Sequence, residues 1–315
     1  MSRELPEGAP GTSASGLVLV DKPAGWTSHD VVGKVRRLAG TRKVGHAGTL
    51  DPMATGLLVI GFNKATRLLT AITGSDKTYL ATVRLGQSTV TDDAEGEVLQ
   101  TRLANAVTED RVRAAMVPLT GAIQQVPSAV SAIKVDGRRA YDRVRAGEDI
   151  ALQARSVTVR RFELTGFRRL DGGRAVDLDV EVDCSSGTYI RALARDLGEA
   201  LGTGGHLTAL RRTVVGPFSV EDAVTIEQLG RRFTATELSE AAAGLFPVRR
   251  LTPDEAVELS FGRRIAPTGR EGTVAAQAPD GSVVALISDR AGRDGTGLEA
   301  KPEIVFAPAP SGGTP

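Results

Sequence analysis

The sequence has few of the residues that build disulfides, metal sites or membrane spans. Its 315 residues include one cysteine and three histidines, and aromatic residues make up 4% of the chain. The lone Cys184 excludes an intrachain disulfide and a zinc site made of several cysteines. No uncharged apolar run approaches the roughly 18 residues of a membrane-spanning helix. These absences favour a cytoplasmic protein with no metal and no membrane contact.

Charge is nearly balanced, because 39 Lys and Arg residues face 38 Asp and Glu residues, for a net charge of +1. A site for a polyanion would therefore have to be local. Basic residues do cluster around Lys134, Arg138 and Arg139, whereas acids gather between Asp92 and Glu97. Such runs usually lie on solvated surfaces, and we expect an acidic and a basic face.

Composition divides the chain into four parts. Residues 1–15 are rich in Gly, Pro, Ser and Thr and lack the apolar core of a secretion signal, so we expect a flexible tail. Residues 16–247 form the main body, from which a basic, turn-rich insertion at 121–155 is expected to protrude. Residues 248–308 change in character, with a possible helix over 251–263 and short strands within 272–287. A Pro- and Gly-rich tail at 309–315 ends the chain.

The most informative local pattern is the turn from Gly45 to Pro52, which holds His46 and ends in Asp51. Its glycines permit tight turns, and Pro52 fixes the direction in which the chain leaves the carboxylate. Asp followed by Pro is also a common helix start, in which the aspartate only caps the helix. The pattern alone leaves both interpretations open.

Periodicity predicts the elements around this turn. Alternation predicts half-buried strands over Thr78–Leu85, which carries Tyr79, and over Ala175–Asp183. Helical spacing predicts one helix capped by Ser28 and a second from Ile190 to Leu201. The second helix places Arg191 in its first turn. By position alone, Arg191 could be a surface residue, and Tyr79 and Leu210 could simply pack in the core.

Six ordered blocks of the chain carry a family resemblance. The blocks are Asp21–Gly25; Gly45–Pro52 with Ala54–Gly56; Asp76–Tyr79 with Arg84–Gly86; Gln125–Tyr141; Cys184–Arg191; and Leu210–Arg212. With these blocks the chain strongly resembles the bacterial tRNA pseudouridine-55 synthases of the TruB family. The resemblance runs from Leu17 to about Val248, and the tail beyond Leu251 is weakly similar to the small RNA-binding PUA domain.

This resemblance implies an α+β fold, with a large mixed and mainly antiparallel sheet flanked by helices and a small C-terminal PUA-like β domain. It implies isomerisation of uridine to pseudouridine at position 55 in the T-loop of tRNA, through base flipping and a broken and re-formed glycosidic bond. No cofactor is needed, because the reaction has no redox change and no group donor. The expected partner is the tRNA elbow, bound by a monomer.

The resemblance also implies roles for particular residues. Asp51 supplies the catalytic carboxylate, and Arg191 pairs with it and keeps it ionised. Tyr79 stacks on the target base and Leu210 packs against it, while His46 fills the space that the base leaves. Tyr189 is also assigned to substrate binding. RNA phosphates are expected to contact the basic side chains of Lys22, Lys134, Arg138 and Arg139.

Two other functions stay open at this point. The same fold could serve a non-catalytic tRNA-binding or tRNA-folding chaperone, although such a protein has no use for a buried Asp–Arg pair that costs desolvation energy. A related synthase could act instead on ribosomal or guide-directed RNA. The sequence also leaves open whether Asp51 attacks the sugar, attacks the base or removes a proton.

Overall fold

The computed structural model describes residues 7–9, 14–128, 153–292, 295 and 297–306, and the backbone of 134–135 and 138–139. The expected C-terminal tail at 309–315 lies outside the described residues, as do residues 1–6 and 10–13 of the N-terminal one. Within that N-terminal segment, Glu7 pairs with Arg232 in an isolated bridge, and the Ser15 carbonyl accepts a hydrogen bond from the Leu238 amide.

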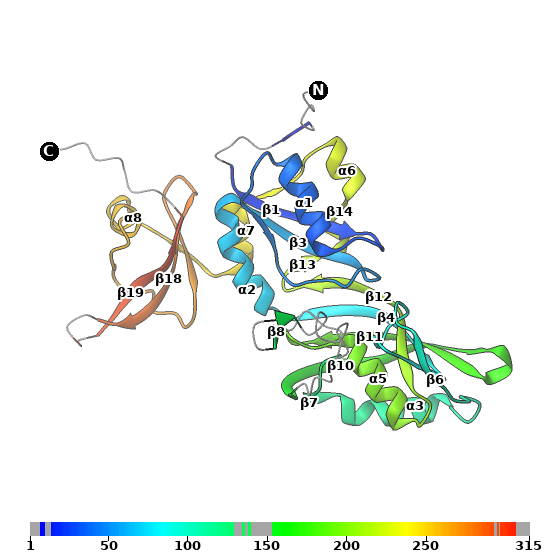
Figure 1. The fold of residues 1–315 in the computed structure, drawn as a ribbon. Coiled ribbons are helices and arrows are strands. Elements are labelled where there is room, and N and C mark those ends of the chain that lie inside the picture. Colours follow the sequence, from blue (N-terminus) through cyan, green and yellow to red (C-terminus); the bar gives the residue numbers. More distant parts are fainter. Residues whose placement is uncertain are drawn as a thin grey trace.

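A large sheet forms the body of the molecule (Figure 1). In the described part of the chain it has eleven strands, eight of which follow the order β14-β1-β3-β12-β4-β11-β10-β7. Most neighbours are antiparallel, but β12 pairs with β3 and β1 with β14 in parallel. The sheet is therefore mixed and mainly antiparallel, as expected. The bounds are β1 Gly16–Lys22, β3 Thr55–Phe62, β4 Lys77–Leu85, β7 Gly121–Gln125, β10 Arg155–Leu170, β11 Ala175–Cys184, β12 Gly205–Val215 and β14 Val224–Thr225, with the short strands β2 Val44–His46, β13 Phe218–Ser219 and β15 Thr236–Glu237 at its margins.

Helices cover the sheet and bury its apolar face. Valines of α1 and leucines of α5 pack in one core with the inward residues of β4 and β11. The predicted helices are confirmed, although Thr27 caps α1 through the Asp30 amide and Ser28 is the first helical residue. The helices are α1 Ser28–Leu38, α2 Leu69–Gly74, α3 Glu109–Met116, α5 Ile190–Ala200, α6 Ile226–Arg231 and α7 Leu238–Leu245, joined by the 3₁₀ turns η1 Asn63–Leu68, η2 Val117–Leu119, η3 Asp171–Gly173 and η4 Val220–Asp222.

The two central strands β4 and β11 have opposite faces of different character. Inward residues such as Tyr79 and Val180 are buried. The outward aspartates of β11 pair with arginines of β4 and β10 and form a set that we call the outer ladder. Its members are Asp177 with Arg84 at 2.8 Å, Asp183 with Arg161 at 2.7 Å, and Asp179 with Arg168. The predicted alternation is therefore confirmed in both strands.

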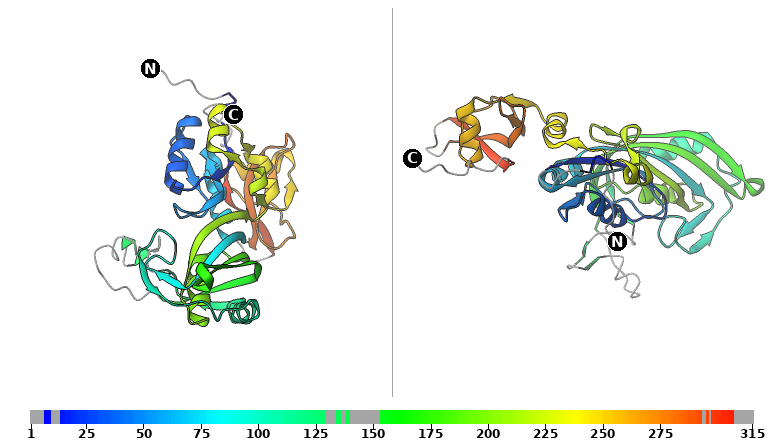
Figure 2. Two further views of the ribbon diagram at one scale, coloured as in Figure 1. Left: turned by 90° about the vertical axis from the view of Figure 1, so that its right-hand side faces the viewer. Right: turned by 90° about the horizontal axis from the view of Figure 1, so that it is seen from above.

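The C-terminal region forms a second, four-stranded sheet in the order β16-β17-β18-β19, with α8 packed on it. It lies beside the main body, next to α7 (Figures 1 and 2). The Val283 amide donates to the Ser239 hydroxyl of α7 at 2.9 Å. The fold is thus α+β with a small C-terminal β domain, as expected. The bounds are β16 Val248–Arg250, α8 Pro253–Ser260, β17 Val274–Gln277, β18 Val283–Ala291 and β19 Leu298–Val305.

Two small hairpins lie outside these sheets. Strands β5 (Gln87–Thr89) and β6 (Val98–Thr101) flank the acidic run between Asp92 and Glu97. Strands β8 (Lys134–Val135) and β9 (Arg138–Arg139) pair antiparallel within the predicted insertion at 121–155. The side chains of this second hairpin lie outside the described residues.

Candidate active site

Asp51 lies on a turn between β2 and β3, beside the strand β12. No helix follows it, because β3 begins at Thr55, and the helix-cap interpretation of Asp51-Pro52 is therefore wrong. Gly56 lets this segment approach β12 closely, since a Cβ there would lie 2.2 Å from the Arg212 carbonyl oxygen, and its φ is +99°. Only glycine fits such a position, and the turn that carries Asp51 is thereby held against the sheet.

Arg191 makes a two-point contact with the Asp51 carboxylate from the first turn of α5. Its Nε lies 3.1 Å from Asp51 Oδ2, and its Nη2 donates to Asp51 Oδ1 at 3.3 Å. The Arg191 side chain is 6% exposed, whereas 35% of the Asp51 side chain is accessible. The interpretation of Arg191 as a surface arginine is therefore wrong. The carboxylate faces open space while its partner cation is buried behind it.

A second carboxylate, Asp93, contacts the same guanidinium. Its Oδ2 lies 3.2 Å from Arg191 Nη1, which also donates to the Thr91 carbonyl at 2.8 Å. The sequence placed Asp93 in a solvated acidic run, but its side chain is 3% exposed. Asp93 is buried because Arg191, about 100 residues further along the chain, packs against its loop. No local sequence pattern could reveal this contact.

Burial dominates the electrostatics of Asp51. Desolvation raises the pKa of its carboxyl group above the ordinary value, Arg191 opposes this rise, and the negative charge of Asp93 adds to it. Removing Arg191 would leave two neighbouring carboxylates without their shared cation. The ionised state of Asp51 therefore depends on Arg191.

A cavity of about 570 Å³ opens above this ion pair. Asp51, Tyr79, Tyr189, Arg191 and Leu210 all line it, so the structure brings together five of the residues singled out in the sequence. Tyr79 and Leu210 are 8% and 7% exposed. A wall of aromatic and aliphatic side chains with one carboxylate at its base suits a small planar polar ligand.

Tyr189 is positioned through its backbone at the start of α5. The Gln125 side chain accepts a hydrogen bond from the Tyr189 amide at 2.8 Å and donates to its carbonyl at 3.1 Å. Gln125 is 1% exposed and ends strand β7. The root of the insertion at 121–155 is thus attached to the beginning of the helix that carries Arg191.

Arg212 is a site residue that sequence reasoning did not select. It lines the cavity, is 1% exposed, and donates to the Leu57 carbonyl at 2.8 Å and to the Gly48 carbonyl at 3.0 Å. These bonds tie the turn before Asp51 to β12. The sequence signals were the basic pair at 211–212, which is equally typical of a surface, and the block Leu210–Arg212 of the family resemblance.

The environment of the Lys22 side chain differs from the predicted one. Its side chain is buried, and its ammonium donates to the carbonyls of Pro23, Trp26 and Pro52 at 3.0, 2.7 and 3.2 Å. Burial lowers the pKa of Lys22 to about 8. An ammonium held by three carbonyls inside the protein is not presented to an RNA phosphate. We therefore correct its role to holding the segment after Asp51 in place.

His46 lies in β2, outside the residues that line the cavity. Its ring meets His29 edge to face, with centroids 5.7 Å apart. Within the described residues, its buried Nδ1 makes no hydrogen bond. Burial lowers the pKa of His46 and so disfavours the charged ring.

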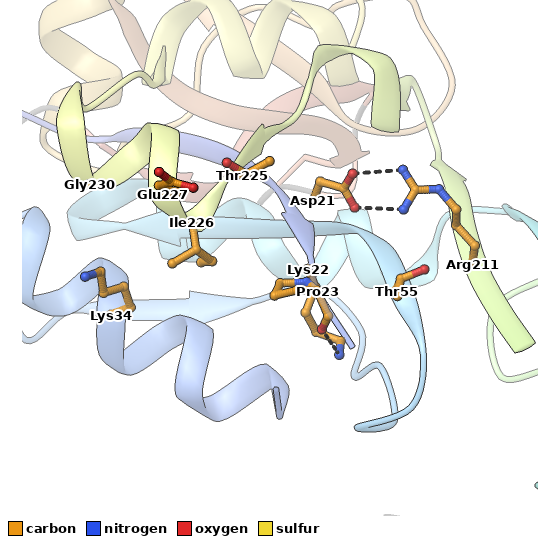
Figure 3. A pocket seen from close by; sticks show the side chains of 10 residues that line it. All are labelled: Asp21, Lys22, Pro23, Lys34, Thr55, Arg211, Thr225, Ile226, Glu227 and Gly230. Carbon is orange, nitrogen blue, oxygen red and sulfur yellow. Dashed lines mark hydrogen bonds and ion pairs between the residues drawn. The ribbon is translucent and has the colours of Figure 1, made fainter. Parts of the chain in front are cut away.

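A second hollow, of about 610 Å³, lies between α1, α6 and the ends of β1 and β3 (Figure 3). Asp21 and Arg211 face each other across it in a two-point ion pair, with bonds of 2.9 and 2.8 Å. Its lining includes no aromatic side chain. The cavity above Asp51 is the better candidate site, because only there does a carboxylate meet an aromatic wall.

The described residues contain no group of three or more His, Cys, Asp or Glu that could hold a metal ion. No helix in the part of the chain that the structure describes is long and apolar enough to cross a membrane.

Family models match almost the whole body of the chain. Residues 36–190 match the N-terminal domain of the TruB family of pseudouridylate synthases. Residues 191–253 match the C-terminal domain of tRNA pseudouridylate synthase B, and residues 246–307 match the C-terminal model of tRNA pseudouridine synthase II.

Individual proteins agree with these models. The chain is 64% identical over 304 residues to tRNA pseudouridine synthase B of Arthrobacter sp. (strain FB24), covering 94% of this chain and 97% of that protein. It is 60% identical over 296 residues to the protein of the same name from Thermobifida fusca (strain YX), covering 93% and 99%. Among solved structures, one titled as a Cbf5-Nop10-Gar1 complex matches with a TM-score of 0.69 and 26% identity, covering 94% of this chain and 86% of that one.

The expected fold is confirmed by this structural match. At 64% identity over nearly the full length of both proteins, the relationship is also far closer than a shared fold would require. The chain belongs to the TruB family of pseudouridylate synthases.

Proposed function

We propose that this chain isomerises uridine to pseudouridine at position 55 in the T-loop of tRNA. The observation that carries the proposal is the accessible Asp51 carboxylate, paired with buried Arg191 under a wall formed by Tyr79 and Leu210. The curated relatives at 60–64% identity are named tRNA pseudouridine synthase B, which supports tRNA as the substrate. We expect a monomer that works in the cytoplasm, where tRNA is modified, without metal or cofactor.

The reaction breaks the bond between C1′ of the ribose and N1 of uracil and forms a bond between C1′ and C5. C5 loses its proton and N1 gains one, so atoms and electrons balance without an added reagent. An ionised carboxylate can attack C1′, attack the base or remove a proton. Each of these roles requires an ionised Asp51 carboxylate beside the nucleotide. The positive charge of Arg191 stabilises this ionised form.

The side chains of the cavity wall would position the uracil base. Tyr79 can stack on a uracil ring, and Leu210 can pack against its edge, so that the base is held while it turns. The aromatic face has no directional bonds to uracil, which suits a ring that must rotate between two glycosidic linkages. Tyr189 lines the same cavity and completes the wall at the start of α5.

The target uridine must leave the folded T-loop to reach Asp51, at a cost of a few kcal/mol for lost stacking and pairing. We assign His46 to the space that the base vacates. Its flat ring can stack against a base. Lys134, Arg138 and Arg139 would contact phosphates and position the RNA without reading its sequence.

Two alternatives are less well supported. A pure chaperone gains nothing from Asp51 and Asp93 around one buried arginine, because desolvating those charges costs folding energy. A related synthase that acts on ribosomal or guide-directed RNA is the second alternative, but this chain shares 64% identity with a tRNA pseudouridine synthase B and 26% with the Cbf5 structure.

Tritium release tests the proposal. A T-arm stem-loop RNA labelled at uracil C5 is incubated with the purified chain in EDTA, and the product is mapped by position. We expect release of tritium and a single pseudouridine at position 55. Tight binding of the RNA without release would contradict the catalytic proposal and favour the chaperone, and modification at another position would contradict the assigned target.

A further inference from the structure

Arg191 has a neighbour on α5 that resembles it in chemistry and in partners. Arg195 lies one turn further along the helix, and side chains four residues apart share a face. Its Nη1 lies 3.4 Å from Asp92 Oδ2, while Arg191 pairs with the adjacent Asp93 at 3.2 Å. Two successive arginines of one helix face thus hold two successive aspartates of one loop.

The loop is shaped for this double contact. Asp92 has a φ of +58°, in a region that residues other than glycine seldom adopt. Its carbonyl accepts the Leu207 amide of β12 at 3.0 Å. Asp92 and Asp93 are 9% and 2% exposed, so both carboxylates are buried against α5. The uncommon backbone conformation of Asp92 is held in place by contacts on both sides.

Arg195 is itself fixed in orientation. Its Nε and Nη2 both donate to Asp196 Oδ1, at 2.9 and 2.8 Å, and Nη2 also donates to the Val126 carbonyl at 2.8 Å. The side chain is 22% exposed and lines no part of the cavity above Asp51. It therefore contacts the loop and the end of the β7 segment, and it does not contact the candidate site.

We propose that Arg195 is a positioning residue for the isomerisation. By holding Asp92, it fixes the loop that presents Asp93 and the Thr91 carbonyl to Arg191, and so sets the position of the Arg191 guanidinium against Asp51. This inference rests on the proposed function. It adds Arg195 and Asp92 to the residues on which the chemical step depends, although neither contacts the nucleotide.

The test compares single-turnover tritium release at saturating T-arm RNA in the wild type, Arg195→Ala, Asp92→Ala and the double variant. Displacement of Arg191 by a fraction of an ångström should lower the rate constant about tenfold or more in each single variant. The double variant should be no slower than the slower single one, because both changes release the same loop. The Kd for the RNA should stay within about twofold of the wild type, because neither residue lines the cavity above Asp51.

Arg84→Ala serves as the matched control. Arg84 makes a two-point pair with Asp177 at 2.8 Å in the outer ladder, on the face of β4 opposite Tyr79. Its loss should leave the rate constant unchanged. Arg195→Lys should recover part of the rate lost in Arg195→Ala, because it restores a charge for Asp92. If Arg195→Ala does not fold, Asp92→Asn and Arg195→Lys are judged by the same rate criterion.

The outcomes separate this proposal from the proposed function. Wild-type release together with a wild-type rate constant in the folded Arg195 and Asp92 variants overturns the positioning role alone. A double variant whose loss is the product of the two single losses overturns it as well. An inactive wild-type chain that binds the RNA overturns the proposed function, and the positioning role with it.

Discussion

The outer ladder and the Asp51 cluster use the same residue types on opposite faces of one sheet, with opposite consequences. In the outer ladder, hydrogen bonds from Arg168 and Arg161 lower the pKa of Asp179 and Asp183. In the cavity, burial raises the pKa of Asp51 although Arg191 contacts it at two points. The comparison shows that pairing with arginine does not by itself determine whether the pKa of an aspartate is raised or lowered. The three aspartates are similarly accessible, but Arg191 and Asp93 beside Asp51 are 6% and 3% exposed, and this desolvated surrounding decides which effect is larger.

The difference also separates stability from function. Ion pairs open to solvent add little to the free energy of unfolding, and they can be lost without harm to a distant site. A buried cation between two carboxylates offsets charges that would otherwise oppose folding. We therefore expect changes in the Asp51 cluster to affect both activity and stability, and changes in the outer ladder to affect stability alone.

The largest contrast should come from removing one arginine on each face. Arg191→Leu leaves the buried Asp93 without its cation and Asp51 without its partner, and should lower the free energy of unfolding by about 3–5 kcal/mol. Loss of this preorganised charge should also slow the chemical step about a thousandfold. Arg168→Leu, which breaks the solvent-exposed pair with Asp179 in the outer ladder, should cost about 1 kcal/mol or less. Urea unfolding and single-turnover tritium release measure both effects.

Equal effects of the two substitutions on the tritium-release rate would contradict this distinction. Should Arg191→Leu fail to fold, Arg191→Lys keeps the charge but loses the two-point geometry. That variant should fold and still be much slower than Arg168→Lys, its counterpart in the outer ladder.

A smaller effect is expected in the pH dependence of the reaction. Asp51 must be ionised, and its pKa is raised, so the rate should fall on the acid side with a midpoint above the ordinary value of 3.8. Arg191 and Lys22 oppose the rise, and Asp93 contributes to it. Asp93→Asn should therefore move the midpoint to lower pH. The measurement is the single-turnover rate constant as a function of pH.

The control for this profile is Asp179→Asn in the outer ladder, which should leave the midpoint where it is in the wild type. A midpoint that moves upward in Asp93→Asn would show that Asp93 acts mainly by holding Arg191, and would contradict the proposed charge repulsion.

The smallest effect should appear in the acid stability of the outer ladder. Because the folded-state pKa of Asp183 is lowered, its contribution to stability is present above the unfolded value and is lost as pH falls through the folded one. Asp183→Asn should therefore be slightly less stable than the wild type at pH 7, and the difference should vanish well below pH 3.8. Urea midpoints at several pH values measure this, and a difference that grows in acid would contradict it.

Much of the local structure could be predicted because its signals are local. Alternation in 78–85 and 175–183 and helical spacing after Ile190 gave the elements that carry Tyr79 and Arg191 nearly to their observed bounds. The carboxylate at Asp51 was found from its turn and from the family resemblance. Each of these patterns depends on residues that are neighbours in the chain.

What could not be predicted depends on contacts between distant segments. Asp93 appeared solvated because its partner Arg191 comes from a helix about 100 residues away. Arg212 looked like half of a basic surface pair, but its bonds to Leu57 and Gly48 hold the Asp51 turn. Lys22 looked available to phosphate, whereas three carbonyls bind it. Burial of a charge depends on the whole fold, which periodicity does not reveal.

The most direct test of the central claim compares two aspartates that differ mainly in which face of the sheet they serve. Asp51→Asn and Asp183→Asn keep the size of the side chain and remove the charge, and each is assayed beside the wild type for tritium release from C5-labelled T-arm RNA. We predict no release above background for Asp51→Asn and a wild-type rate for Asp183→Asn. Release by Asp51→Asn at a rate near that of the wild type would contradict the assignment of Asp51 as the catalytic carboxylate.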